Sequence, residues 1–287
     1  MSKVLVSEEN LTNIANAIRE KNGETTTYKP GDMATAIQNI SSGGDSELEV
    51  SFMSSIDGSL GANVTKLPSG ITSIGDGAFY KCTNLALTTL SNEITKIGKN
   101  AFESCTNLAL TELPSSLEKI YAAAFRFCTK LSFTKLPSKL TYIDEYSFNG
   151  CTNLALTELP SGLTYLGMQA FYKCSNIELT EIPSGITNIN DHTFYACSKL
   201  STITILGLVT NIRSNAFSHC SNLSSIILPN VTKVPTGTSN MFSNTPIASG
   251  TGYIYVPDTL VDSFKTATNW STYADQIKPI SELEASA

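Results

Sequence analysis

Apolar positions recur along most of this chain with a constant step of 23 residues. The step separates seven phenylalanines, all seven cysteines, and a leucine or isoleucine placed three residues after each cysteine. The phenylalanines are Phe79, Phe102, Phe125, Phe148, Phe171, Phe194 and Phe217, and the cysteines are Cys82, Cys105, Cys128, Cys151, Cys174, Cys197 and Cys220. An unbroken period of this length predicts a solenoid, because a unit this small buries its apolar side only by stacking on its neighbours.

The first part of each unit is a strand-like run of six residues, such as 85–90 or 108–113. Stacked coils would pair these runs at a spacing of about 4.8 Å. The apolar positions are the first, third and sixth in five copies, but the first, fourth and sixth in the last two. Because side chains alternate along a strand, neither pattern can turn all three inward, so we expect a bend or a bulge.

A second apolar group has the spacing of one irregular or helical turn rather than that of a long helix. Its first copy consists of Ile71, Ile74, Ala78 and Phe79. A glycine follows the second isoleucine or its equivalent in three copies, which predicts a backbone position with positive φ. These glycines are Gly75, Gly98 and Gly167.

The repeated residues resemble the BspA-like leucine-rich repeat family, whose units read Cys-Thr-x-Leu, a strand, Pro, Ile-Gly, and Ala-Phe before the next Cys. Residues 82–85, 74–75 and 78–79 follow this pattern, and the likeness extends over 67–229. It implies a solenoid with a sheet along one side and a role in surface recognition rather than chemistry. We therefore expect an α/β solenoid of leucine-rich repeats, with a small helical module before it and a cap after it.

We expect four regions along the chain. Residues 1–41 read as a helical hairpin, 42–66 as a linker and cap strand, 67–245 as the solenoid, and 246–287 as a C-terminal cap. The hairpin resembles a short module of tail and other virion proteins from phages that infect Gram-positive bacteria, on the basis of residues 11–23 and 28–37. That likeness implies an attachment device, and a simple cap for the first coil is the alternative.

Charge and hydropathy exclude several classes of protein. The net charge is -6 and there is no basic run, which argues against a nucleic-acid partner. No apolar stretch approaches 18 residues, so we expect no transmembrane helix and no membrane insertion. The N-terminus carries no apolar region typical of a signal peptide. We expect a virion location, or a bacterial cell surface if an export signal is missing.

No pattern of catalytic residues occurs in the sequence, so we expect no enzyme activity. Two histidines and the lack of a Cys-x-x-Cys pair argue against a metal site, and we expect no cofactor. One cysteine per coil, always at the same place, is best interpreted as a ladder of buried thiols, although the spacing of neighbouring coils also permits disulfides.

The remaining candidate is a binding face formed by the fifth position of the strand-like run. Its residues are Thr89, Glu112, Lys135, Glu158 and Glu181. The fourth position forms a parallel row of threonines, namely Thr88, Thr111, Thr134, Thr157 and Thr180. We interpret the chain as a tail-associated phage protein that binds a host surface protein or glycan and contacts other virion proteins through 1–41. The alternative is a bacterial adhesin or protein-interaction protein of the BspA type.

Overall fold

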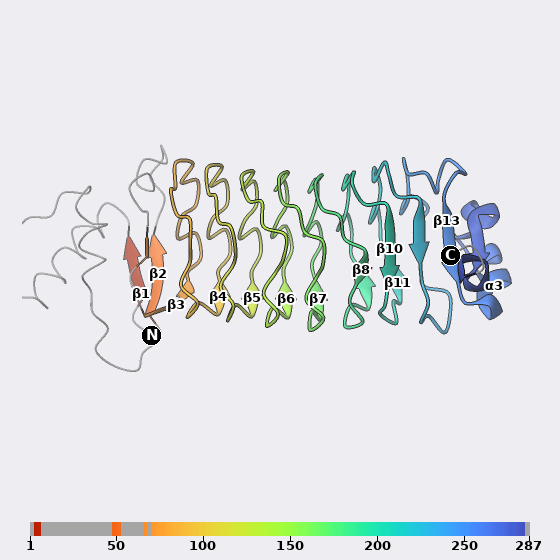
Figure 1. Ribbon diagram of the computed structural model, residues 1–287, viewed down its shortest axis with the longest axis horizontal. Helices are drawn as coiled ribbons and strands as arrows, with labels where there is room; N and C mark the ends of the chain where they lie inside the picture. The colour runs from red at the N-terminus through yellow and green to blue at the C-terminus, as the bar shows by residue number, and fades with distance from the viewer. Residues whose placement is uncertain (1–2, 7–47, 53–65, 68–69, 285–287) are drawn as a thin grey trace, which may run out of the picture.

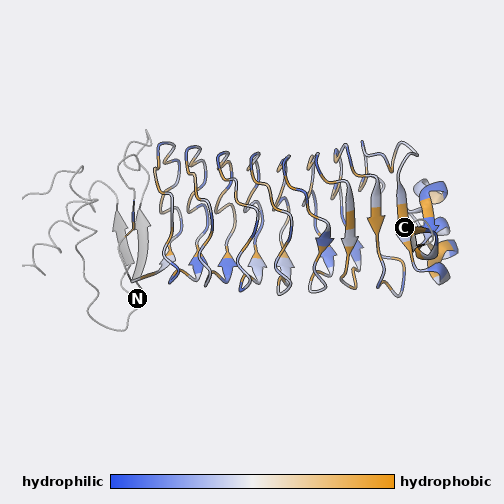
Figure 2. Cartoon of the chain, viewed as in Figure 1, coloured by the Kyte–Doolittle hydropathy of each residue, from blue (hydrophilic) through white to orange (hydrophobic). Residues whose placement is uncertain are grey.

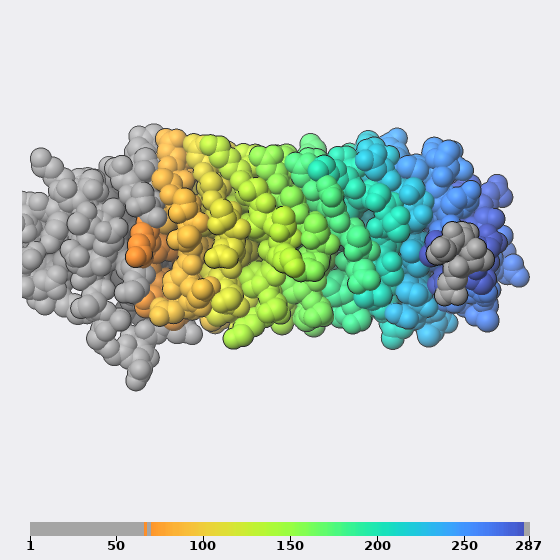
Figure 3. Space-filling view, viewed as in Figure 1, coloured from red at the N-terminus to blue at the C-terminus, as the bar shows by residue number. Residues whose placement is uncertain are grey.

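The structure is a computed structural model that describes residues 3–6, 48–52, 66–67 and 70–284. These residues form a β-solenoid of about 9 turns with repeats of about 23 residues. The coils stack side by side along one long axis, and the helices that follow them lie at the C-terminal end (Figure 1). In the space-filling view the successive coils are in contact along the whole described array (Figure 3).

A row of very short parallel strands runs along one side of the solenoid. The first sheet holds seven strands in sequence order, each hydrogen-bonded to the strand of the next coil. They are β1 (Lys3–Val6), β2 (Leu48–Phe52), β3 (Ile71–Ile74), β4 (Lys96–Ile97), β5 (Lys119–Ile120), β6 (Tyr142–Ile143) and β7 (Tyr165–Leu166). The pair β9 (Asn188–Ile189) and β11 (Asn211–Ile212) continues the same positions of the repeat as a separate sheet.

Among the residues that the structure describes, a second row of strands occurs only in the C-terminal half. It forms a parallel five-stranded sheet in the order β14-β13-β12-β10-β8. Its members are β8 (Glu181–Ile182), β10 (Thr202–Ile205), β12 (Ser225–Ile227), β13 (Tyr253–Val256) and β14 (Ile277–Pro279). The strands expected at 85–90 and 108–113 are absent, because those described residues form no strand.

Burial along the six-residue runs explains this difference. In 85–90 the fourth and fifth residues, Thr88 and Thr89, are both exposed, and an alternating strand cannot place two consecutive side chains outside. The expected bend or bulge in a strand is therefore replaced by a run that forms no strand. In the later run, Ile203 and Ile205 are buried on either side of Thr204, and this alternation matches strand β10.

The core consists of columns of identical side chains. The phenylalanine column continues to Phe242, and consecutive ring centroids from Phe79 onward lie 5.2 to 5.9 Å apart. All seven cysteines are buried, and the six from Cys105 to Cys220 are free thiols, which confirms the predicted thiol ladder for those coils. From Cys105 to Cys220, each Sγ lies 2.9 to 3.1 Å from the backbone oxygen of the phenylalanine one coil before and donates to it.

The turn between the two apolar parts of each coil contains left-handed residues, but not at the predicted glycines. In that column the positive φ lies two residues later, at Gly77, Asn100 and their equivalents, and it recurs four residues further on. Gly98 is needed for a different reason, because a Cβ there would lie 2.7 Å from the backbone nitrogen of Asp76 in the preceding coil. The prediction of a positive φ at Gly75, Gly98 and Gly167 is therefore wrong.

The expected α/β class is also corrected, because the described residues are mainly strand and turn. Left-handed residues on both sides of Phe79 prevent the turn from continuing as a helix. Helical segments among the described residues occur only after the repeats, as η3 (Asp258–Leu260), α3 (Val261–Thr266), η4 (Ser271–Gln276) and α4 (Ile280–Glu284).

The two ends of the described array differ from the repeats. At the C-terminal end, the rings of Trp270 and Tyr273 pack edge-on against Phe242, and both side chains are buried. At the other end, residues 3–6 fall within the range 1–41 expected to form a separate module, yet they pair with β2 in the first sheet. The predicted helical hairpin itself lies outside the described residues.

Candidate functional site

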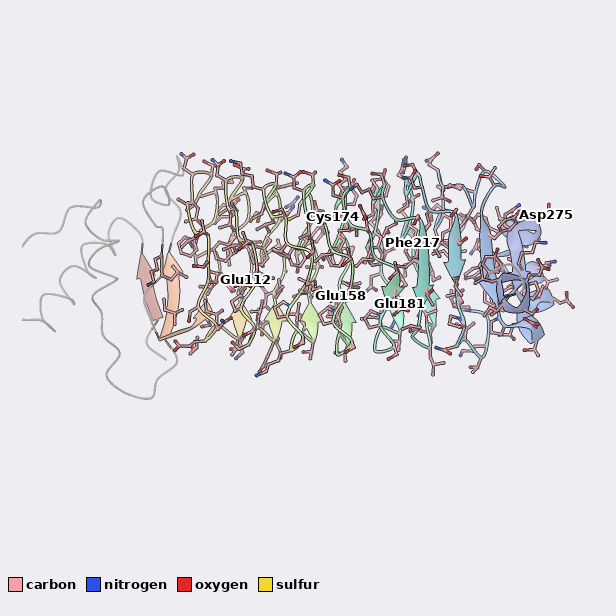
Figure 4. The ribbon with its side chains drawn as sticks, in the orientation of Figure 1. Glu112, Glu158, Cys174, Glu181, Phe217 and Asp275 are labelled. Carbon is pink, nitrogen blue, oxygen red and sulfur yellow. The ribbon has the colours of Figure 1, made fainter. Side chains whose placement is uncertain are left out.

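The five residues predicted to form a binding face are brought together as one row. Thr89, Glu112, Lys135, Glu158 and Glu181 are all exposed and occupy equivalent places in consecutive coils. Figure 4 shows Glu112, Glu158 and Glu181 following one another along the long axis. We call these five residues the acidic row.

One ion pair links two members of the acidic row. Lys135 Nζ lies 3.0 Å from Glu158 Oε1, and the two side chains are 70% and 60% exposed. A pair this exposed adds little to folding stability, because water and salt screen it. Its charges remain accessible to a partner. The threonine row beside it, Thr88 to Thr180, is exposed as well.

A second outward row, which sequence reasoning missed, follows the short strands. In each two-residue strand the first side chain faces outward and the second is buried, as for Lys96 and Ile97 in β4. The outward residues are Ser73, Lys96, Lys119, Tyr142, Tyr165, Asn188 and Asn211, which we call the short-strand face. Figure 2 shows β4 and β5 in blue because each begins with a lysine.

The signal for this face was present in the sequence. Acidic residues outnumber basic ones in the chain by 25 to 19, yet no carboxylate occurs among the seven residues of the short-strand face. The residue type changes along the row from lysine to tyrosine to asparagine, so a search for one repeated type overlooks it.

Tyrosines form the centre of the short-strand face. The rings of Tyr142 and Tyr165 stack with centroids 4.6 Å apart and an interplanar angle of 10°. Tyr121 leans against Tyr142 at 6.1 Å. Loss of hydration, followed by the nearby negative charge of Asp144, raises the pKa of Tyr142 to about 12. The phenol is therefore neutral at physiological pH.

The two ends of the short-strand face differ in charge. Asn211 Nδ2 donates to Asn188 Oδ1 at 2.6 Å, so the C-terminal end is a neutral amide pair. At the other end, Lys96 and Lys119 are direct partners in the sheet. Within the described residues neither lysine belongs to an ion pair.

A third group of rings lies at the turns. The Arg126 guanidinium sits 4.6 Å from the ring centre of Phe127 and also pairs with Glu103 at 3.3 Å. Farther along, Tyr172 stacks on Tyr195 with centroids 4.8 Å apart. The His219 ring lies 4.8 Å from that of Tyr195 and extends this group of rings.

Nothing in the described residues forms a metal-binding cluster of His, Cys, Asp and Glu side chains. The thiols offer no reactive site, because burial raises the pKa of Cys174 and the other inner cysteines far above the ordinary thiol value. In the part of the chain that the structure describes, no helix has the length and apolar character needed to cross a membrane.

Several solved structures resemble this one. A leucine-rich repeat protein of T. pallidum is 27% identical, with a TM-score of 0.42 and coverage of 67% of this chain and 73% of that one. One from Bacteroides ovatus is 21% identical, with a TM-score of 0.40 and coverage of 65% and 59%. A leucine rich cell surface protein from Faecalibacterium prausnitzii is 17% identical, with a TM-score of 0.33 and coverage of 77% and 80%.

Sequence comparison is decisive for the family. No curated protein matches the chain. The description that matches is "BspA type Leucine rich repeat region (6 copies)", over residues 59–178 and 145–259. These two ranges together span most of the chain and contain all seven phenylalanine–cysteine repeats. This chain is therefore a member of the BspA-type leucine-rich repeat family.

Proposed function

We propose that this protein is a non-enzymatic recognition protein whose outward rows bind a protein or a glycan at a cell surface. The observation that carries the proposal is the pair of exposed rows, which hold side chains at one-coil intervals on a fully packed core. In a solenoid, each coil contacts only its neighbours, and an extended surface of regularly spaced side chains results. Such a surface suits binding of an extended partner.

The cellular context is the finer part of the proposal. A tail-associated virion protein that contacts other virion proteins through 1–41 is supported only by the likeness of residues 11–23 and 28–37 to phage modules. Those residues lie outside the described ranges, and the matched family range begins at residue 59. A bacterial surface adhesin or protein-interaction protein is the alternative, and the family membership fits either context.

Charge reversal on the acidic row tests the recognition role. We expect full-length protein to bind bacterial or host cells, and the double variant Glu112→Lys/Glu158→Lys to bind them differently from the wild type if that row meets the partner. The control is Glu93→Lys, which changes an exposed carboxylate elsewhere on the repeat. If the wild-type protein binds neither cells nor extracted surface proteins and glycans, a structural role replaces recognition.

Attachment through the N-terminal region needs a separate experiment. Because β1 belongs to the first sheet, residues 11–37 should be replaced by a Gly-Ser segment of equal length rather than removed. The connection between parallel strands β1 and β2 is then kept. We expect cell binding to persist and incorporation into a larger particle or oligomer, measured by light scattering, to be lost. Unchanged assembly would remove the attachment role.

A further inference from the structure

We propose that the short-strand face is a binding site for a linear glycan that carries carboxylate groups, with a sugar ring on Tyr165 and a carboxylate at Lys96 and Lys119. The inference rests on the proposed recognition function and names the class of ligand. Three features of the face carry it: an ordered exposed ring, a neutral hydrogen-bonding surface beside that ring, and two unpaired cations at the far end.

The exposed ring belongs to Tyr165, whose side chain is 41% exposed. Tyr142 supports one side of the ring by parallel stacking at 4.6 Å, and Tyr121 supports Tyr142 in turn. On the other side, the next residue of the row is the smaller Asn188. A ring held in this way binds with little loss of conformational entropy, as the rigid aromatic anchors of many binding surfaces do.

Neutral hydrogen-bonding groups surround this ring on the C-terminal side. The Asn188 and Asn211 amides are linked at 2.6 Å, and Asn188 Nδ2 also donates to Thr187 Oγ1 at 3.1 Å. The hydroxyls of Thr164 and Thr210 donate to backbone oxygens one coil before, at 3.1 and 3.2 Å. A hydroxyl that donates in this way keeps lone pairs that accept from a ligand hydroxyl.

This combination favours a sugar over a protein partner. Protein–protein interfaces depend on apolar or aromatic anchors that are fully covered and surrounded by a dry rim. Here a single ring face stands among hydroxyls and amides whose positions are fixed by hydrogen bonds between coils. Such fixed polar groups match the many hydroxyls of a sugar.

The lysines supply the charge complementarity. Lys96 and Lys119 face outward from adjacent strands in direct register, and like charges placed opposite each other destabilise a sheet. An anionic ligand group would relieve that repulsion. The carboxylates of Asp144 and Glu145 lie near Tyr165, and Asp144 also lies near Tyr142, so the ligand carboxylate is assigned to the lysine end and a neutral ring to the tyrosine end. Two coils separate Lys119 from Tyr165, or about 10 Å at the usual strand spacing, which two or three linked sugars span.

Calorimetric titration of the full-length protein tests the site with three probes: a hyaluronan hexasaccharide and a non-sulfated chondroitin hexasaccharide, in both of which acidic and neutral sugars alternate, and the neutral N-acetylglucosamine hexamer. We expect at least one acidic hexamer to bind more tightly than the neutral one. Tyr165→Ala should weaken that binding roughly tenfold or more, and Tyr165→Phe should retain most of it. Lys119→Gln should reduce the preference for the acidic probe.

The matched control is Tyr253→Ala, because Tyr253 is 40% exposed but lies on the other sheet, in β13. Circular dichroism of each variant verifies that it is folded. The proposal is overturned if neither acidic hexamer binds at concentrations up to about 1 mM, or if Tyr165→Ala and Tyr253→Ala bind equally well. If the wild-type protein binds cells but binds no acidic hexamer, this glycan site alone is overturned, whereas absence of cell binding by the wild type would count against the recognition function itself.

Discussion

Truncating Phe148 to alanine should weaken the solenoid at its middle. The ring is fully buried and stacks on Phe125 at 5.4 Å and on Phe171 at 5.5 Å, while Phe133 meets it edge-on at 6.2 Å. Truncation of a buried phenylalanine costs about 3–5 kcal/mol through lost burial and the remaining cavity. Because rings on three sides lose a partner, we expect the upper half of that range.

The same change should also separate the two halves of the array. Each coil contacts only its neighbours, so a defect in one coil interrupts cooperativity between the coils on either side. Trp270 is the only tryptophan and is buried beyond the last coil, so its fluorescence reports the C-terminal part, whereas far-ultraviolet circular dichroism reports the whole chain. We expect these two unfolding curves to coincide in the wild type and to diverge in Phe148→Ala.

Urea titration with both probes is the assay. A loss of about 4 kcal/mol lowers the midpoint of the affected transition by about 1–2 M for m-values near 2–3 kcal/mol/M. Phe127→Ala is the matched control, because that ring is 39% exposed and its main contact is the Arg126 guanidinium. We expect a loss within about 1 kcal/mol there. A midpoint for Phe148→Ala within error of the wild type would show that the phenylalanine column is not the main core.

Four further predictions concern contacts and burial within the coils. Gly98→Ala should destabilise the protein by about 1–3 kcal/mol in thermal or urea unfolding, because the added Cβ would meet the backbone of the preceding coil. Gly77→Asn should cost much less, because Asn100 fills the equivalent left-handed position one coil later. Equal losses for the two variants would contradict this explanation. Glu158→Gln should change stability by less than about 1 kcal/mol, and a larger loss in the same titration would mean that its ion pair is not solvated. Native protein at pH 8 should resist alkylation at all seven cysteines and take up seven labels when unfolded without reductant, which mass spectrometry counts; fewer labels would reveal disulfides. Burial raises the pKa of Cys220 from 9.0 to about 12, so the folded state holds the thiol proton more tightly than the unfolded state does. The contribution of this thiol to the free energy of unfolding is therefore fully present below pH 9. It should be lost as the pH rises toward 12, which urea titrations at increasing pH would measure.

The repeat and its core were predictable from sequence because burial is periodic. Phe148 and Cys151 lie where the 23-residue step places them, and both are buried. The pairing of strands was not predictable in the first coils, because a hydrophobic pattern reports burial and not hydrogen bonding. A strand of two residues such as Lys96–Ile97 is too short to show alternation.

Two other features escaped for equally specific reasons. The left-handed position of the turn is occupied by residues such as Ala123 and Tyr146, whose type does not indicate a positive φ. The glycines two residues earlier therefore suggested the wrong position. The acidic row was found because one residue type recurs at one position. The short-strand face follows the same 23-residue step, but it was missed because lysine, tyrosine and asparagine succeed one another there and no single residue type marks the row.

The change of strand pattern along the solenoid bears on where a partner would bind. The coil that contains β8 and β9 is hydrogen-bonded in both rows, whereas the earlier described coils have strands only in the short-strand row. More backbone hydrogen bonds per coil make local opening less frequent, so hydrogen exchange should be slower at β8, β9 and β10 than around 85–90. Tyr165 in β7 lies one coil before this doubly bonded region, and Asn188 lies within it. Asn188 and Asn211 therefore belong to the doubly bonded coils, whereas β7 is the last strand of the first sheet and is not paired with β9. Stacking on Tyr142 holds the Tyr165 ring instead. The ring and the amides are thus both ordered before a ligand arrives, which favours binding with little conformational cost.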